Sequence, residues 1–224
     1  MRAPHTIALL LAAWTAAFAG PPTRIERKLE HAGYINVGTA IPGLHVDMMY
    51  ARQDNFTGSV LYDSLTRAYL HPDAARALAR AQAELSRRRK GTFLLVKDAA
   101  RPVSVQRRMF DTVRGTPHSA YVANPRRGGG THNFGIAVDV TLCDSLGHEL
   151  PMGTPVDFFG AAAHITDENT LVTQGRITAK ELQNRRLLRG VMTAAGFKTI
   201  RKEWWHFELQ RREVAARRYS LIDF

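Results

Sequence analysis

The sequence predicts an α+β fold, a single domain in which helices flank a central, mostly antiparallel sheet. Short apolar or β-rich runs are typical of strands, and longer segments carry apolar residues at helical spacing. The hydrophobic fraction of 45% is that of a globular protein and argues against disorder. About 205 residues remain after the first nineteen, which suits one domain with a sizeable core, although two small lobes would also fit.

Residues 1–19 are predicted to be a signal peptide, so the domain is expected to span residues 20–224. Arg2 supplies a positive charge, residues 7–18 form an apolar run broken only by Thr15, and residues 17–19 form a small-x-small cleavage site. The run is too short for a comfortable membrane span, and no later segment is long enough. We therefore expect an exported, periplasmic protein without a membrane span in its mature part; a buried N-terminal helix is the alternative.

The first half of the domain is expected to alternate extended and helical segments. Residues 41–50 read as an extended segment that leads into a loop at 54–58. A helix is expected to open at Pro72-Asp73, capped by Asp73, and to terminate at Gly91. Residues 92–96 form a β-rich run that is expected to be a central strand, and residues 103–113 resume helical spacing after Pro102.

The second half of the domain contains the most apolar predicted strand, residues 136–142. Residues 115–130, which precede it, are loop-like. Thr178-Ala179-Lys180-Glu181 is a capping box, which predicts a helix that begins there and has Gly196 as its C-cap. Residues 197–200 and 204–209 then read as two further strands.

A carboxylate and two histidines are predicted to share a metal ion. Asp139 lies inside the apolar strand, and a buried charge is costly unless it is paired or bound to a metal. His132 lies in the loop that enters this strand, and His206 follows among aromatic residues. A catalytic zinc site takes three protein groups and keeps a fourth position open, so the set fits such a site. Taken singly, a loop histidine and a hydrogen-bonded core histidine are the alternatives.

Glu203 precedes His206 by three residues, which makes a geometric demand. Side chains alternate along a strand, so residues three apart point to opposite faces. Glu203 and His206 can therefore reach one site only if the chain turns or bulges between them.

Cysteine content and charge narrow the function classes. The single Cys143 excludes an internal disulfide and a multi-cysteine zinc site, and a packed thiol is expected there. A net charge of +11 invites a nucleic-acid partner, but no nucleic-acid-binding motif accompanies the basic residues, and export leads away from nucleic acid. No such partner is expected, and weak attraction to an anionic envelope surface is a secondary hypothesis. The basic residues form short, dispersed clusters that we expect to be mostly solvated: residues 87–90, 126–127, 185–186, 211–212 and 217–218.

The residues of the predicted metal site also carry a family resemblance. The pattern H-x-x-G-x-A-x-D at residues 132–139, followed by E-x-W-H at residues 203–206, resembles the zinc D-Ala-D-Ala peptidases, most closely the VanX-type D-alanyl-D-alanine dipeptidases. Many members have a serine two residues before the first histidine, where this chain has Gly130. Further blocks extend the resemblance over most of the mature chain: residues 54–58, 98–102, 151–158 and 184–186.

The resemblance implies a role for each candidate residue. His132, Asp139 and His206 would hold one zinc ion per chain. Glu203 would act as general base and then acid, and Arg101 would stabilise the oxyanion that forms when water adds to a peptide carbonyl.

Three further residues are substrate-binding candidates. Asp98 could orient Arg101 or bind the free amino group of a dipeptide. Asp157 could receive the same ammonium or cap the next helix. Thr131 is adjacent to Gly130, and its hydroxyl could replace that of the missing serine.

The activity that the resemblance implies is zinc-dependent hydrolysis of the dipeptide D-Ala-D-Ala to two D-alanines. The dipeptide is made in the cytoplasm, so an exported enzyme could not destroy it where it is made. Export would instead suit cell-wall peptide turnover. The first alternative is a peptidoglycan D,D- or L,D-carboxypeptidase on the same scaffold, which needs an open cleft for a longer peptide. A non-catalytic wall-binding module is the second, and it would have no use for Glu203 or Arg101.

Overall fold

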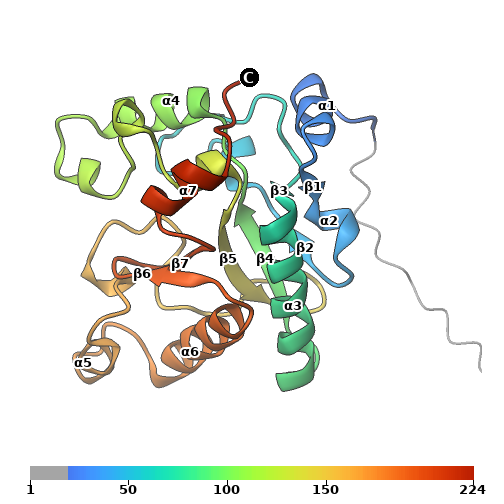
Figure 1. Cartoon of the computed structure of the whole chain (residues 1–224). Helices are drawn as coiled ribbons and strands as arrows, with labels where there is room; N and C mark the ends of the chain where they lie inside the picture. The colour runs from blue at the N-terminus through green and yellow to red at the C-terminus, as the bar shows by residue number, and fades with distance from the viewer. Residues whose placement is uncertain (1–19) are drawn as a thin grey trace, which may run out of the picture.

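A five-stranded sheet forms the centre of the protein in the computed structural model, which describes residues 20–224 (Figure 1). The strand order is β2-β4-β5-β7-β6, in which β2 runs parallel to β4 and the other neighbours are antiparallel. The predicted α+β class is therefore confirmed, whereas the predicted signal peptide lies outside the described residues. The helices are α1 (Arg24–His31), α2 (Val37–Ala40), α3 (Pro72–Arg88), α4 (Val103–Val113), α5 (Glu168–Thr173), α6 (Ala179–Ala194) and α7 (Arg212–Arg218), and the strands are β1 (Ile35–Asn36), β2 (His45–Val46), β3 (Tyr69–Leu70), β4 (Phe93–Asp98), β5 (Ala137–Cys143), β6 (Lys198–Ile200) and β7 (Glu203–Glu208).

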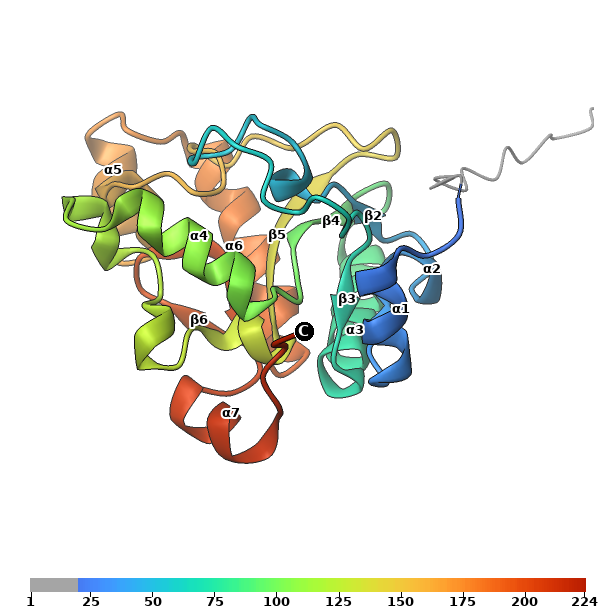
Figure 2. The same ribbon diagram turned by 90° about the horizontal axis from the view of Figure 1, so that it is seen from above.

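The two longest helices, α3 and α6, pack against each other and against the sheet (Figure 1). Seen from above, α4 and α7 lie apart from α3, near the loops that enter β5 (Figure 2). The short strands β1 and β3 form a separate antiparallel pair beside α1. Within the described part of the chain, no helix is long and apolar enough to cross a membrane.

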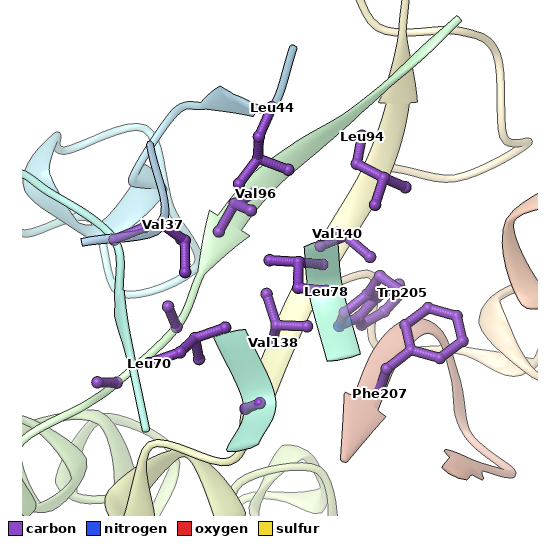
Figure 3. Close-up of a cluster of buried hydrophobic side chains, with 14 of the residues drawn as sticks. Val37, Leu44, Leu70, Leu78, Leu94, Val96, Val138, Val140, Trp205 and Phe207 are labelled. Atoms are coloured by element: carbon purple, nitrogen blue, oxygen red, sulfur yellow. The ribbon is translucent and has the colours of Figure 1, made fainter. Parts of the chain in front are cut away.

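Apolar residues at alternate positions of three strands form the core beneath α3 (Figure 3). Leu78 of α3 lies over this cluster and is fully buried. Burial of a leucine-sized side chain contributes roughly 1.5–3 kcal/mol. Because side chains alternate along a strand, the residues between the core positions, which include Asp139 and His206, face the other side of the sheet. The strand members of the cluster are Leu94, Val96, Val138, Val140, Trp205 and Phe207.

Both predicted ends of α3 differ from the structure. The N-cap of α3 is His71, whose Nδ1 accepts a hydrogen bond of 3.2 Å from the backbone N–H of Asp73. The prediction that Asp73 is the cap is wrong, because Pro72 occupies the first helical position and moves the cap to the residue before it. At the other end α3 stops at Arg88, and Gly91 lies in the following turn with a φ of +73°.

The other two predicted helices are present. Helix α4 has the predicted bounds, and Thr178 and Glu181 form the predicted capping box of α6. The predicted C-cap of α6, Gly196, is wrong by one residue: the cap is Ala195, and Gly196 follows it with a φ of +101°, the left-handed conformation that glycine adopts most easily. Cys143 is fully buried, and burial together with nearby Asp144 and Glu149 raises the pKa of its thiol to about 12, as suits a packed thiol.

Candidate active site

The three predicted metal ligands converge on one face of the sheet. Asp139 of β5 is the ladder partner of His206 of β7, and His132 lies in the 3-10 turn Thr131–Phe134 that precedes β5. Nδ1 of His206 lies 3.0 Å from Oδ1 of Asp139 and 3.2 Å from Nε2 of His132. One ligand atom from each residue lies within 4.8 Å of the others, so the three can share one ion.

The second nitrogen of each histidine ring faces an oxygen atom. Nδ1 of His132 lies 2.7 Å from the carbonyl oxygen of Ala99, and an N–H donated there leaves Nε2 as the lone-pair donor. Nε2 of His206 lies 3.6 Å from Oε2 of Glu208, which leaves Nδ1 facing the other ligands. Such outer oxygen partners fix the orientation of metal-binding imidazoles.

The charges of this cluster suit a divalent cation. Burial raises the pKa of Asp139, but the neighbouring imidazoles of His132 and His206 outweigh burial and hold that pKa well below its usual range. For His206, burial lowers the pKa, but hydrogen bonding to Asp139 and Glu208 outweighs burial and raises the pKa to about 10. Without a metal the cluster therefore favours a proton on His206, which a metal ion would displace. Two imidazole nitrogens and one carboxylate form a donor set typical of catalytic zinc.

The predicted irregularity next to His206 is present. Thr199 of β6 pairs with Phe207, and the next residue, Ile200, pairs with Glu203. An uninterrupted antiparallel ladder would pair Ile200 with His206, so the register shift accommodates three extra residues of β7. As a result, Glu203 and His206 line the same pocket.

The Glu203 carboxyl group has an unusual affinity for a proton. Burial raises its pKa to about 8, the charge of His206 opposes the rise, and the charges of Asp139 and Asp157 add to it. A carboxyl with a pKa near neutrality can both accept and return a proton.

Arg101 is held beside the three candidate metal ligands by Asp98. Nε of Arg101 donates to Oδ2 of Asp98 at 3.0 Å, Nη2 donates to the same oxygen, and Nη1 donates to Gln106 at 2.8 Å. Nη2 lies 3.9 Å from Oδ2 of Asp139. Oδ1 of Asp98 accepts from the hydroxyl of Tyr62 at 2.6 Å, so this fully buried carboxylate is occupied, and it is not one of the residues that line the pocket.

Asp157 lies in the pocket and not at the start of a helix. Its Oδ2 accepts a hydrogen bond of 2.5 Å from the hydroxyl of Tyr50. Its φ of +63° is uncommon outside glycine and occurs where a site constrains the backbone. The next helical turn, Ala161–Ala163, has Gly160 as its N-cap, so the alternative role of Asp157 as a helix cap is wrong.

Thr131 also lines the pocket, but its hydroxyl is engaged. Oγ1 of Thr131 donates a hydrogen bond of 2.9 Å to Oε2 of Glu208.

The pocket that these residues line has a volume of about 260 Å³. Pockets for drug-sized ligands measure about 300–1,000 Å³, so this one suits a smaller molecule. A larger cavity of about 940 Å³ lies along β2, but none of the predicted site residues lines it.

Among the pocket residues that the sequence did not predict are Tyr50, Glu208 and Arg212. Glu208 could have been found, because it follows His206 by two residues in a strand and therefore shares its face. Tyr50 and Arg212 carry no local signal, and Arg212 was expected to be solvated.

Comparison with known proteins agrees with this geometry. The sequence model of the family described as D-ala-D-ala dipeptidase matches residues 30–222. The chain is similar to the D-alanyl-D-alanine dipeptidase of Escherichia coli K12, with 34% identity over 78% of this chain and 83% of the relative. It is also similar to the D-alanyl-D-alanine dipeptidases of Enterococcus faecalis V583 and Enterococcus faecium, each 29% identical, over 79% and 80% of this chain and 91% and 92% of the relatives. The chain belongs to the D-ala-D-ala dipeptidase family of metallopeptidases.

Proposed function

We propose that this protein is a zinc-dependent dipeptidase that hydrolyses D-Ala-D-Ala to two D-alanines. One observation carries the proposal: a histidine–aspartate–histidine cluster, Glu203 and Arg101 line one small pocket. The names of the relatives supply the dipeptide as substrate.

His132, Asp139 and His206 would hold the zinc ion. Bound there, zinc supplies Lewis-acid chemistry that polarises the scissile carbonyl and makes water more acidic. Its positive charge also favours the ionised form of Glu203, whose pKa is raised to about 8 in the metal-free site.

Glu203 takes a proton from the attacking water and passes it to the leaving amine. The water oxygen adds to the carbonyl carbon, the C–N bond breaks, and two amino acids leave. Arg101 stabilises the negative charge that develops on the carbonyl oxygen, and Asp98 holds the guanidinium in place. Asp157 attracts the substrate ammonium, and Thr131 contributes to the pocket wall.

We further propose that residues 1–19 are a signal peptide and that residues 20–224 form the exported enzyme, which acts in cell-wall peptide turnover. The charged, apolar and small-residue regions of that segment support export.

The experiment that tests the proposed function measures release of free D-alanine by the zinc-loaded protein. D-Ala-D-Ala and an N-acylated peptide ending in D-Ala-D-Ala are each incubated with wild type and with Glu203→Ala. We expect cleavage of the free dipeptide only, and its loss in the variant with zinc retained. Cleavage of the acylated peptide would indicate a carboxypeptidase instead, and no cleavage of either would refute the proposal.

A further inference from the structure

The pocket contains one arginine for which the proposed mechanism has no use. Arg212, the first residue of α7, lines the pocket together with Gly129, Gly130 and Glu208. Its side chain comes from a part of the chain far from the β4–α4 segment that supplies Arg101. It therefore reaches the pocket from a different element.

The two arginines of the pocket differ in how their charge is balanced. Arg101 donates through Nε and Nη2 to the Asp98 carboxylate, which neutralises it. Arg212 donates through Nε to the carbonyl oxygen of Gly129 at 3.0 Å and through Nη2 to the carbonyl oxygen of Arg127. Neither acceptor carries a formal charge, and the ion pairs found among residues 20–224 do not include Arg212. It is thus a pocket cation whose charge is unbalanced.

The carboxylate of Glu208, which lines the same pocket, does not balance the charge of Arg212. Oε1 of Glu208 accepts from Nη1 of Arg211 at 2.9 Å, and Oε2 accepts from Thr131 and faces His206. Glu208 is therefore shared between an arginine, a threonine and a histidine.

The guanidinium of Arg212 is also fixed in position before any ligand arrives. The two carbonyl oxygens hold one side of it, and Nη1 has no hydrogen-bond partner within the described residues. Gly128, with a φ of +89°, makes room for it, because a Cβ atom there would overlap Nη2. A cation already held in place loses little conformational entropy when an anion binds.

We propose that Arg212 binds the free carboxylate at the carboxyl end of the substrate. The inference rests on the proposed dipeptidase function and adds the group that recognises the second charged end. A dipeptide in a small pocket brings one ammonium and one carboxylate. Asp157 is available for the first, and Arg212 supplies an unbalanced, oriented cation for the second. The enzyme then selects against substrates whose carboxyl end is amidated or extended.

The test compares D-Ala-D-Ala with its carboxyl-terminal amide, measured as a substrate or as a competitive inhibitor. Both ligands are offered to zinc-loaded wild type, Arg212→Gln, Arg212→Lys and Arg217→Gln. Arg217 lies exposed on the same helix and outside the pocket, so it is the matched control. Zinc content and Tm of every variant report whether the loop that Arg212 holds remains folded.

We expect wild type to bind the free acid about 10- to 100-fold better than the amide, as a charge-assisted hydrogen bond would give. Arg212→Gln should raise KM for the free acid by a similar factor, leave kcat and the binding of the amide nearly unchanged, and so remove the discrimination. Arg212→Lys should retain part of it, and Arg217→Gln all of it.

Provided that wild type cleaves the free acid, the proposed function stands, and two results would then overturn the inference. Arg212→Gln could leave the discrimination between acid and amide unchanged, or it could weaken the binding of both ligands equally. If wild type releases D-alanine from neither ligand, the proposed function itself fails, and the inference falls with it.

Discussion

The hydroxyl of Thr131 donates a hydrogen bond of 2.9 Å to Oε2 of Glu208, the same oxygen that lies 3.6 Å from Nε2 of His206. Thr131 immediately precedes His132 in the turn that enters β5. Glu208 therefore connects the turn that carries one candidate metal ligand with the strand that carries another. The relative position of the two imidazoles depends in part on this carboxylate.

The first prediction follows for Glu208→Gln. Loss of the carboxylate charge should weaken the orientation of His206 and reduce zinc affinity by about 10- to 100-fold, the usual effect of losing such an outer partner. Competition with a zinc chelator measures it. Thr131→Val should have a smaller effect, because it leaves the charge in place. The control is Glu213→Gln, an exposed position on α7. Unchanged zinc affinity in Glu208→Gln would contradict this role.

The second prediction concerns Asp98→Asn. An asparagine can still accept from Tyr62, but it cannot neutralise the guanidinium of Arg101. If Asp98 acts through Arg101, kcat should fall on the order of 10- to 100-fold, and KM should stay nearly unchanged. The fall in kcat is then close to that caused by removing an oxyanion-stabilising donor. Steady-state kinetics on D-Ala-D-Ala measure both constants.

Tyr62→Phe is the matched control for Asp98→Asn, because it removes the other partner of the same carboxylate without changing its charge. It should reduce kcat much less. A rise in KM with kcat retained in Asp98→Asn would instead assign Asp98 to substrate binding.

Most of the candidate metal site could be predicted from the sequence because it depends on local patterns. An aspartate inside an apolar strand, a histidine in the turn before that strand and a histidine inside a second strand limit the possible ligands. The alternation of side chains also showed that Glu203 and His206 need an irregular strand, and the register shift between β6 and β7 supplies it.

The remainder of the site depends on contacts between distant segments, which have no local signal. The hydroxyl of Tyr50 meets Asp157 from a position 107 residues away. Arg212 reaches the carbonyl oxygen of Gly129 across 83 residues, so its basic neighbours alone suggested a solvated face. Asp73 failed as a cap for a local reason, since a proline at the first helical position leaves the capping role to the preceding residue.

The third prediction concerns stability and pH at Glu26, which is fully buried at the start of α1. Its carboxylate accepts from the backbone N–H groups of Thr23, Thr66 and Arg67 at 2.9, 3.1 and 3.2 Å and pairs with the Arg67 guanidinium. Burial raises the pKa of Glu26, but these donors outweigh it, so the folded-state pKa lies below the ordinary value of 4.5. The stabilisation is therefore complete above pH 4.5 and is lost as the pH falls through the lowered pKa.

Glu26→Gln should lower the free energy of unfolding at pH 7 by about 1–3 kcal/mol, because the half-buried guanidinium of Arg67 and the backbone N–H groups that face Glu26 lose a charged acceptor. It should also flatten the pH dependence below pH 5. Urea unfolding at several pH values measures both effects. Glu213→Gln, on the surface, should change stability by less than about 0.5 kcal/mol. A parallel pH dependence in wild type and Glu26→Gln would contradict the assignment.

The fourth prediction concerns Asp157 and the substrate ammonium. Burial raises the pKa of Asp157 to about 7, and the charges of Asp139 and Asp98 add to the rise, whereas Tyr50 and Arg101 oppose it. Below this pKa the carboxyl group is neutral and cannot attract an ammonium. The α-amino group of a peptide loses its proton near pH 8, so opposite charges coexist mainly between these two values. A bound metal ion would move the lower of these two limits to lower pH, but substrate binding would still weaken as the pH falls through that limit.

For wild type, KM for D-Ala-D-Ala should therefore rise as the pH falls through the pKa of Asp157. In Asp157→Asn, KM should be raised about 10- to 100-fold at pH 7.5, as expected for loss of a charged hydrogen-bond partner, and should no longer depend on pH on the acid side.

Tyr50→Phe separates the effect of the Asp157 carboxylate itself from the effect of its pKa. It removes the hydroxyl that lowers the pKa of Asp157 but keeps the carboxylate, so the acid limb should shift to higher pH while substrate binding at high pH persists. A KM that rises at low pH to the same extent in wild type and Asp157→Asn would assign the titration to another group. In that case the ammonium would be bound elsewhere in the pocket.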